Sequence, residues 1–239
     1  MSTFQQGNEP NEPGSHVFER RIILLKRRLV REATLAIGML ESALDALWTL
    51  DTAGAKLVRQ EDDQVDREEV AIEQEGFEIL ALQHAFARDF RTITFVLKVN
   101  ADIERVADHA TGIAKIANRI AKKMPPGTVP QWPTALRDLG QRLPMQCHEL
   151  LRAVLDEDAQ AASRLVEADE TIDQLDRRLF EEVIEMMKAE GKTDAALAIG
   201  LHIARVGREL ERVGDLMKNI AEDLIYLVTG KIVRHRDKS

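Results

Sequence analysis

Cysteine, glycine, proline and aromatic residues are all scarce in this sequence of 239 residues, and each scarcity excludes a class of protein. The single cysteine, Cys147, rules out an intramolecular disulfide framework and fits a reducing compartment. With 13 glycines, 7 prolines and 4% aromatic residues, the chain has little material for the turns and strands of a β-rich fold. The composition therefore favours an all-α protein.

Long apolar runs and an excess of positive charge are missing as well. No run approaches the roughly 18 apolar residues that a membrane-spanning helix needs, and residues 1–15 lack the apolar segment of a signal peptide. The formal net charge of −8 argues against nucleic acid as a main partner, because phosphate binding needs a basic surface. We therefore expect a cytoplasmic chain with no membrane insertion and no nucleic-acid partner.

Four of the seven prolines lie in one segment, where a helix is expected to end. Four prolines and a glycine within residues 124–133 stop any helix there and divide the chain into two halves. Apolar residues at helical spacing predict three antiparallel helices in each half, and Gly191-Lys192 is expected to cap the fifth helix. The predicted helices cover about 16–50, 55–84, 87–123, 134–156, 159–190 and 194–229. The predicted organisation is a disordered lead (1–16), a first three-helix bundle (17–123), a linker (124–133), a second three-helix bundle (134–230) and a basic tail (231–239).

One acidic sequence occurs twice, 107 positions apart. Residues 101–108 read A-D-I-E-R-V-A-D, and residues 208–215 read R-E-L-E-R-V-G-D. Further upstream, D-D-Q-V-D at 62–66 corresponds to D-E-T-I-D at 169–173, at the same separation and without a gap. A fixed period over such a span predicts that one structural unit has been duplicated.

Each copy carries two pairs of carboxylates four residues apart, so the members of a pair share one helix face. The four pairs are Asp62 with Asp66, Glu104 with Asp108, Asp169 with Asp173, and Glu211 with Asp215. A single pair is most simply a solvated acidic face, with Arg105 or Arg212 neutralising its neighbours. Four pairs in a duplicated frame favour metal binding, because a cation would remove the like-charge repulsion. Oxygen ligands suit iron, Mn²⁺, Mg²⁺ or Ca²⁺, and Zn²⁺ less.

A helical projection places the pairs of the third and sixth helices nearly opposite the apolar stripe of each helix. We therefore expect these carboxylates on the outward, solvent-facing side of each bundle, beside the pair of a neighbouring helix. The stripe of the third helix comprises Ile103, Val106, Ala110, Ile113 and Ala117, and that of the sixth comprises Leu210, Val213, Met217, Ile220 and Leu224.

Residues 102–110, D-I-E-R-V-A-D-H-A, resemble the D-L-E-R-I-G-D-H-A signature of the PhoU family of phosphate-specific transport accessory proteins. Residues 209–230, which end in I-Y-L-V-T-G, resemble the second copy and end of that family. The A-R-D-F-R sequence at 87–91 resembles the element that opens its third helix. The resemblance extends from about His16 to Gly230. Ala107 and Leu216 depart from the family pattern, but no carboxylate is lost.

The resemblance implies two three-helix bundles that hold multinuclear metal clusters on the four acidic pairs. It also implies a negative regulator of the phosphate-starvation response. The expected partners are the ATPase subunit of the phosphate ABC transporter and the sensor histidine kinase of the phosphate response. Separately from the resemblance, the exposed ends and the duplicated organisation of the chain favour a homodimer. The resemblance implies no catalytic activity.

Two alternatives stay open at this stage. One is a metal-dependent phosphoesterase, in which carboxylate-held metal activates water, although the sequence offers no separate general acid or base. The other is a metal-free helical scaffold. Among the remaining residues, His109 is expected at the surface, Cys147 in the core, and Trp48 and Trp132 at the ends of the bundles.

Overall fold

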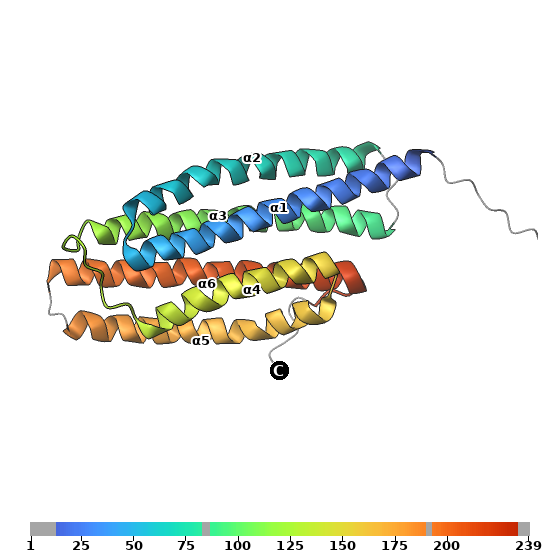
Figure 1. The fold of residues 1–239 in the computed structure, drawn as a ribbon. Helices are drawn as coiled ribbons and strands as arrows, with labels where there is room; N and C mark the ends of the chain where they lie inside the picture. Colours follow the sequence, from blue (N-terminus) through green and yellow to red (C-terminus); the bar gives the residue numbers. More distant parts are fainter. Residues whose placement is uncertain (1–12, 83–86, 190–192, 234–239) are drawn as a thin grey trace, which may run out of the picture.

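Six long α-helices make up the computed structural model, which describes residues 13–82, 87–189 and 193–233. They are α1 (Pro13–Thr49), α2 (Thr52–Leu82), α3 (Ala87–Ala121), α4 (Thr134–Asp156), α5 (Ala159–Ala189) and α6 (Asp194–Thr229) (Figure 1). These ranges contain no β-strand. The all-α prediction is confirmed, and every expected helix is present. The expected cap at Gly191-Lys192 lies outside the described residues, as does most of the predicted lead and tail.

The first two helices of each half are joined by the same tight turn. Leu50 and Glu157, which are 107 positions apart, both adopt a left-handed conformation, with φ of 53° and 49°. The aspartate that follows each of them, Asp51 or Asp158, accepts a hydrogen bond of 2.9 Å from the backbone N–H two residues later. An aspartate in this position caps the next helix. The duplication therefore extends to the geometry of the turns.

The proline-rich segment between α3 and α4 is tied to the end of α1 by tryptophan contacts. The rings of Trp132 and Trp48 meet edge to face, with centroids 5.5 Å apart and an interplanar angle of 82°. The Trp132 indole N–H also donates to the Trp48 carbonyl oxygen at 3.3 Å. The prediction that both tryptophans pack at the end of a bundle is confirmed.

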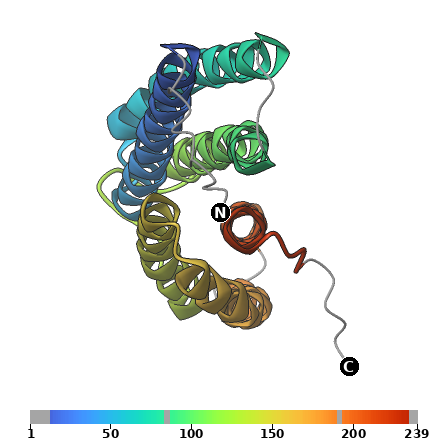
Figure 2. The same ribbon diagram turned by 90° about the vertical axis from the view of Figure 1, so that its right-hand side faces the viewer.

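Helices α1, α2 and α3 form one bundle, and α4, α5 and α6 form the other (Figure 1). The bundles lie side by side, with α3 packed on α6 and α1 on α4, while α2 and α5 occupy opposite outer edges (Figures 1 and 2). Across the described ranges, no helix has the length and apolar character that crossing a membrane would require. The two helices that carry the repeated acidic sequence, α3 and α6, are thus in contact at the centre.

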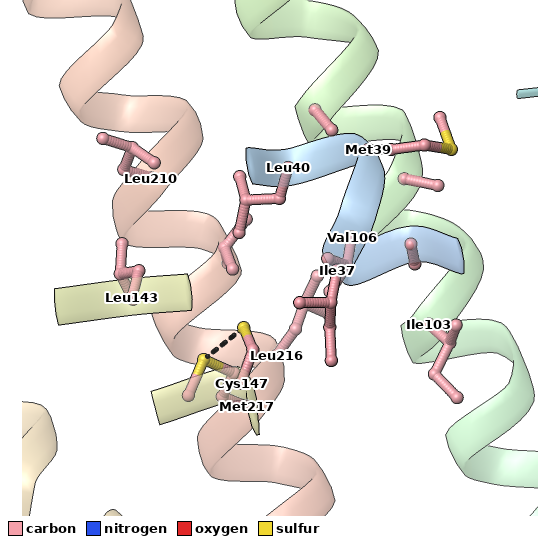
Figure 3. Packing of buried hydrophobic residues seen from close by; sticks show 14 of the residues in the cluster. Ile37, Met39, Leu40, Ile103, Val106, Leu143, Cys147, Leu210, Leu216 and Met217 are labelled. Carbon is pink, nitrogen blue, oxygen red and sulfur yellow. Dashed lines mark hydrogen bonds between the residues drawn. The ribbon is translucent and has the colours of Figure 1, made fainter. Parts of the chain in front are cut away.

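A continuous apolar core runs through both bundles. Figure 3 shows side chains of α1, α3, α4 and α6 meeting in it, among them Leu40, Val106, Leu143 and Leu216. The apolar stripes predicted for the third and sixth helices are buried. Cys147 lies in the same core, 3.2 Å from the sulfur of Met217, and burial raises the pKa of its thiol to about 12. The prediction of a core thiol is confirmed.

Candidate functional site

The four predicted site residues of the first bundle come together where α2 and α3 run side by side. Partial burial raises the pKa of Asp62, and the charges of Asp108 and Asp66 raise it further. Burial also raises the pKa of Glu104 to about 7, with added contributions from Asp108, Asp66 and Asp62. Because these carboxylates perturb one another, they form one electrostatic group. We call Asp62, Asp66, Glu104 and Asp108 the first acidic set.

The first acidic set is less exposed than the helical projection indicates. Asp66 and Asp108 are exposed, but Asp62 and Glu104 are half-buried. The projection treats α3 as an isolated helix, whereas α2 packs along it and covers part of its polar side. Of the α3 pair that the projection placed toward solvent, Asp108 is exposed as expected and Glu104 is partly covered.

In the second bundle, a lysine already neutralises part of the corresponding group, the second acidic set (Asp169, Asp173, Glu211 and Asp215). The ammonium of Lys218 donates to Asp169 at 2.5 Å. This hydrogen bond raises the pKa of Lys218, and the charges of Asp169, Glu222 and Asp173 raise it further. The residue at the corresponding position of the first bundle is Thr111, which carries no charge. The first acidic set therefore has no lysine at the equivalent position, although the charge of Lys115 lowers the pKa of Asp62.

The α6 pair of the second acidic set also has cationic neighbours. Arg208 lies 3.0 Å from Glu211, and Arg212 lies 3.8 Å from Asp215. Burial raises the pKa of Glu211, and the charge of Asp215 adds to this effect. One carboxylate oxygen of Glu211 is buried with no hydrogen-bond partner among the described residues. Arginines therefore lie near both carboxylates of this pair, although one oxygen of Glu211 accepts no hydrogen bond from the described residues.

His109 joins the two bundles close to the first acidic set. Its Nδ1 lies 2.8 Å from a carboxylate oxygen of Glu209 on α6, and only 19% of its side chain is exposed. The prediction of a surface histidine is therefore wrong, because α6 covers this side of α3. The hydrogen bond to His109 is also the main reason why the pKa of Glu209 is lowered.

Sequence reasoning missed two acidic residues next to the first acidic set. Glu69 of α2 has a pKa raised by burial and by the charges of Glu73 and Asp66, and its own charge acts on Glu104. Glu32 of α1 is completely buried, with 0% of its surface exposed. Comparison of the two copies of the repeat predicts that position 32 is buried, because the corresponding residue of the second copy, Leu139, is apolar.

The donor chemistry of the first acidic set fits the predicted cations better than that of the second. Half-buried carboxylates with raised pKa values are stabilised in their charged form by a nearby cation, and hard divalent ions prefer such oxygen ligands. In the second acidic set, Lys218 already supplies positive charge to Asp169. Within the described residues, however, no three His, Cys, Asp or Glu side chains are placed so as to hold one metal ion. Binding therefore requires side-chain rearrangement in either set.

Comparison with known proteins points to one family. The PhoU domain matches residues 29–117 and again residues 136–224, and these two matches start 107 positions apart, like the acidic repeat. A phosphate-specific transport system accessory protein PhoU homolog of Pseudomonas aeruginosa is 34% identical over 211 residues, covering 86% of this chain and 85% of the relative. The corresponding homolog 1 of Thermotoga maritima is 29% identical over 214 residues, covering 90% of both chains.

Solved structures show the same arrangement of helices. The crystal structure of PhoU from Pseudomonas aeruginosa superimposes with a TM-score of 0.83 at 30% identity, covering 90% of this chain and 100% of that one. The phosphate transport system regulatory protein PhoU from Streptococcus pneumoniae gives a TM-score of 0.79 at 27% identity, covering 90% and 99%. The domain matches alone account for more than half of the sequence. The chain therefore belongs to the PhoU family.

Proposed function

We propose that this chain is a non-catalytic regulator that represses the phosphate-starvation response and phosphate uptake. In this proposal it is an adaptor between the ATPase subunit of the phosphate ABC transporter and the sensor histidine kinase. Its relatives are named accessory proteins of phosphate-specific transport, and one solved relative is described as a phosphate transport regulatory protein. The similarity covers both bundles. Two acidic regions suit an adaptor, because complementary charge selects partners.

Metal binding at the acidic sets is the second part of the proposal. The observation that carries it is that the pKa values of Asp62 and Glu104 are both raised, first by partial burial and then by the charges of surrounding carboxylates. A bound Mn²⁺, Mg²⁺, Ca²⁺ or iron ion would offset this repulsion. We propose that the first acidic set binds such an ion more tightly than the second, because binding at Asp169 must displace Lys218.

Calorimetric titration with Mn²⁺ tests the first acidic set. We expect the double variant Asp62→Asn/Asp108→Asn to lose affinity by a factor of about ten or more, since changes even to the partners of metal ligands cost that much. A control, Glu167→Gln, removes an exposed carboxylate on the opposite bundle and should bind like the parent chain. Equal Mn²⁺ affinity in the double variant would rule out this set as the site.

Lys218→Thr tests the lower affinity proposed for the second acidic set. The substitution copies Thr111 of the first bundle and frees Asp169 from its ammonium partner. We expect Mn²⁺ to bind the second set more tightly in this variant, and we expect the further substitution Asp173→Asn to cancel the gain. No gain in affinity would show that Lys218 does not limit binding.

Co-purification with the transporter ATPase and with the sensor kinase tests the adaptor role. We expect the chain to retain both proteins, and Glu104→Ala/Asp108→Ala to weaken at least one association. In cells that lack their own PhoU protein, the parent chain should restore repression of a phosphate-starvation reporter at high phosphate. Retention of neither partner would contradict the adaptor role. Unchanged retention by the variant would separate docking from the first acidic set.

The non-catalytic role is supported by the names of the relatives, which describe accessory and regulatory proteins of phosphate transport. His109, which is adjacent to Asp108 in the sequence, has its Nδ1 engaged by Glu209 of the other bundle. Since this contact leaves Nε2 of His109 without an assigned role, an activity assay is the direct test. We expect no Mn²⁺-dependent hydrolysis of p-nitrophenyl phosphate, and turnover above the rate without protein would favour the phosphoesterase alternative.

A further inference from the structure

Glu32, in the middle of α1, is a buried acidic residue whose carboxyl group forms no hydrogen bond with the described residues. It is 0% exposed, and neither of its oxygens has a hydrogen-bond partner in the described part of the chain. Glutamate is almost never fully buried unless it is paired, because an isolated buried charge is strongly unfavourable. The nearby guanidinium of Arg28 donates instead to Glu68 at 3.0 Å and to Glu75 at 3.2 Å. Compensation for Glu32 must therefore come from a proton that keeps the group neutral or from a bound cation.

The surroundings of Glu32 are rich in oxygen atoms from α2 and α3. Burial raises its pKa to about 8, and the charges of Glu69, Glu68 and Glu104 contribute to the rise. Asn100 of α3, which is 2% exposed, donates its side-chain N–H to the main-chain oxygen of Glu69 at 3.0 Å. Its own side-chain oxygen has no hydrogen-bond partner among the described residues. Asn100 is thus hydrogen-bonded to Glu69, the charge of Glu69 acts on Glu32, and both Glu32 and Asn100 have buried acceptor oxygens that accept no hydrogen bond from the described residues.

The second bundle lacks this combination. At the corresponding positions, 107 residues later, Glu32 is replaced by Leu139 and Asn100 by Gly207. Leu139 is 0% exposed and packs in the core. The second copy of the repeat therefore folds with an apolar residue at the position that Glu32 occupies in the first copy. Since the fold does not require the buried carboxylate, a ligand of the first bundle is the better explanation for it.

We propose that Glu32, Glu69, Asn100 and Glu104 form an inner cation site inside the first bundle, in addition to the first acidic set. Its ligand is a hard divalent cation such as Mn²⁺ or Mg²⁺, because all four residues supply oxygen. The three glutamates do not converge on one point within the described structure, but rotation about their side-chain torsions moves the carboxylates without moving a helix.

The inner site rests on the proposed function in one respect, since Glu104 belongs to both groups of ligands. It differs from the first acidic set by taking a ligand from α1. An ion bound to Glu32, Glu69 and Glu104 therefore joins all three helices of the bundle. Because the ligands must be deprotonated, binding is expected to release protons and to weaken as pH falls.

The test is the number and affinity of Mn²⁺ ions bound by the full chain, measured by calorimetry and by elemental analysis after dialysis. The variants are Glu32→Gln and Glu32→Leu, and the second of these copies Leu139 of the other bundle and so preserves packing. We expect both to bind one Mn²⁺ fewer, or to bind it at least about tenfold more weakly. Glu19→Gln, which removes an exposed carboxylate from the same helix, should match the parent chain.

Two further variants separate the inner site from the first acidic set. Asp108→Asn should weaken the outer ion and leave the inner ion bound, whereas Asn100→Leu should weaken the inner ion. If the parent chain binds Mn²⁺ and both Glu32 variants bind the same number with the same affinity, the inner site is overturned while the first acidic set stands. A parent chain that binds no Mn²⁺ would overturn both.

Discussion

Glu32 makes the stability of the metal-free chain depend on pH. Its pKa is about 8 in the folded chain, against an ordinary value of 4.5. The folded chain holds the proton of Glu32 more tightly than the unfolded chain does. The contribution of this proton to the free energy of unfolding is therefore complete below pH 4.5 and is lost as pH rises through 8. The charged groups that act on it are Arg28 on its own helix, Glu68 and Glu69 on α2, and Glu104 on α3. At about 1.4 kcal/mol per pH unit, the loss between pH 5 and pH 8 is about 3 kcal/mol.

Glu32→Gln should remove this component of the pH dependence. Urea denaturation in the presence of a chelator, at pH 5 and at pH 8, measures the unfolding free energy of both chains. Because all other groups titrate in both proteins, the difference between the two chains isolates Glu32. We expect the parent chain to lose about 3 kcal/mol more than the variant over this range. Equal losses would mean that Glu32 ionises as an exposed carboxylate does.

The burial of Glu32 was predictable from position but not from residue type. Leu25, Leu29, residue 32 and Ala36 follow one another at spacings of three or four, which places residue 32 on the apolar face of α1. The residue itself is charged and stands beside Arg31, in a run of basic residues typical of a solvated surface. Residue type and helical position therefore point in opposite directions, and such conflicts are expected at functional sites.

At the scale of helices, the contact between α1 and α4 depends on a glycine. A Cβ atom on Gly140 would lie 2.6 Å from the Trp48 ring. That ring is held by its contact with Trp132 and by Arg137, whose guanidinium lies 5.4 Å from the ring centroid. We expect Gly140→Ala to destabilise the chain by about 1–3 kcal/mol, as overpacked cores do. Chemical denaturation measures the change.

Gly38→Ala is the matched control for this contact. Gly38 also lies within a helix, but no atom of the described residues beyond its local backbone lies within 4 Å of the added Cβ. Alanine in a helix is more favourable than glycine by about 0.5–1 kcal/mol, so this variant should be more stable than the parent chain. An equal gain from Gly140→Ala would show that the Trp48 ring moves aside freely.

The ends of the helices were predictable from sequence, whereas the packing of one bundle on the other was not. Prolines and capping residues act locally, so the break between α3 and α4 is visible in the sequence itself. The second buried face of α3, which includes Ala107 and Ala114, lies on the side packed by neighbouring helices. Alanine is common both in cores and on helix surfaces, and for that reason it does not indicate a contact. The projection therefore detected one apolar stripe where the helix has two buried sides.

At the scale of the whole molecule, the two bundles share a core and are joined across α3 and α6. The same cluster of buried residues includes side chains from every helix. The hydrogen bond between His109 and Glu209 adds a polar link between the bundles. The first acidic set and the inner site both include Glu104 of α3, which packs directly on α6. A cation that stiffens the first bundle therefore acts on a helix that the second bundle contacts.

Leu216→Ala tests whether the two bundles unfold as one unit. Leu216 of α6 is 2% exposed and lies in the core beside residues of α1 and α3 (Figure 3). Truncation of a buried leucine costs about 2–5 kcal/mol. Because the core is continuous, we expect differential scanning calorimetry to show a single transition at a lower temperature.

The control Leu201→Ala, at a site on the same helix that is 65% exposed, should leave the transition nearly unchanged. Two transitions, of which Leu216→Ala shifts only one, would show that the bundles unfold independently.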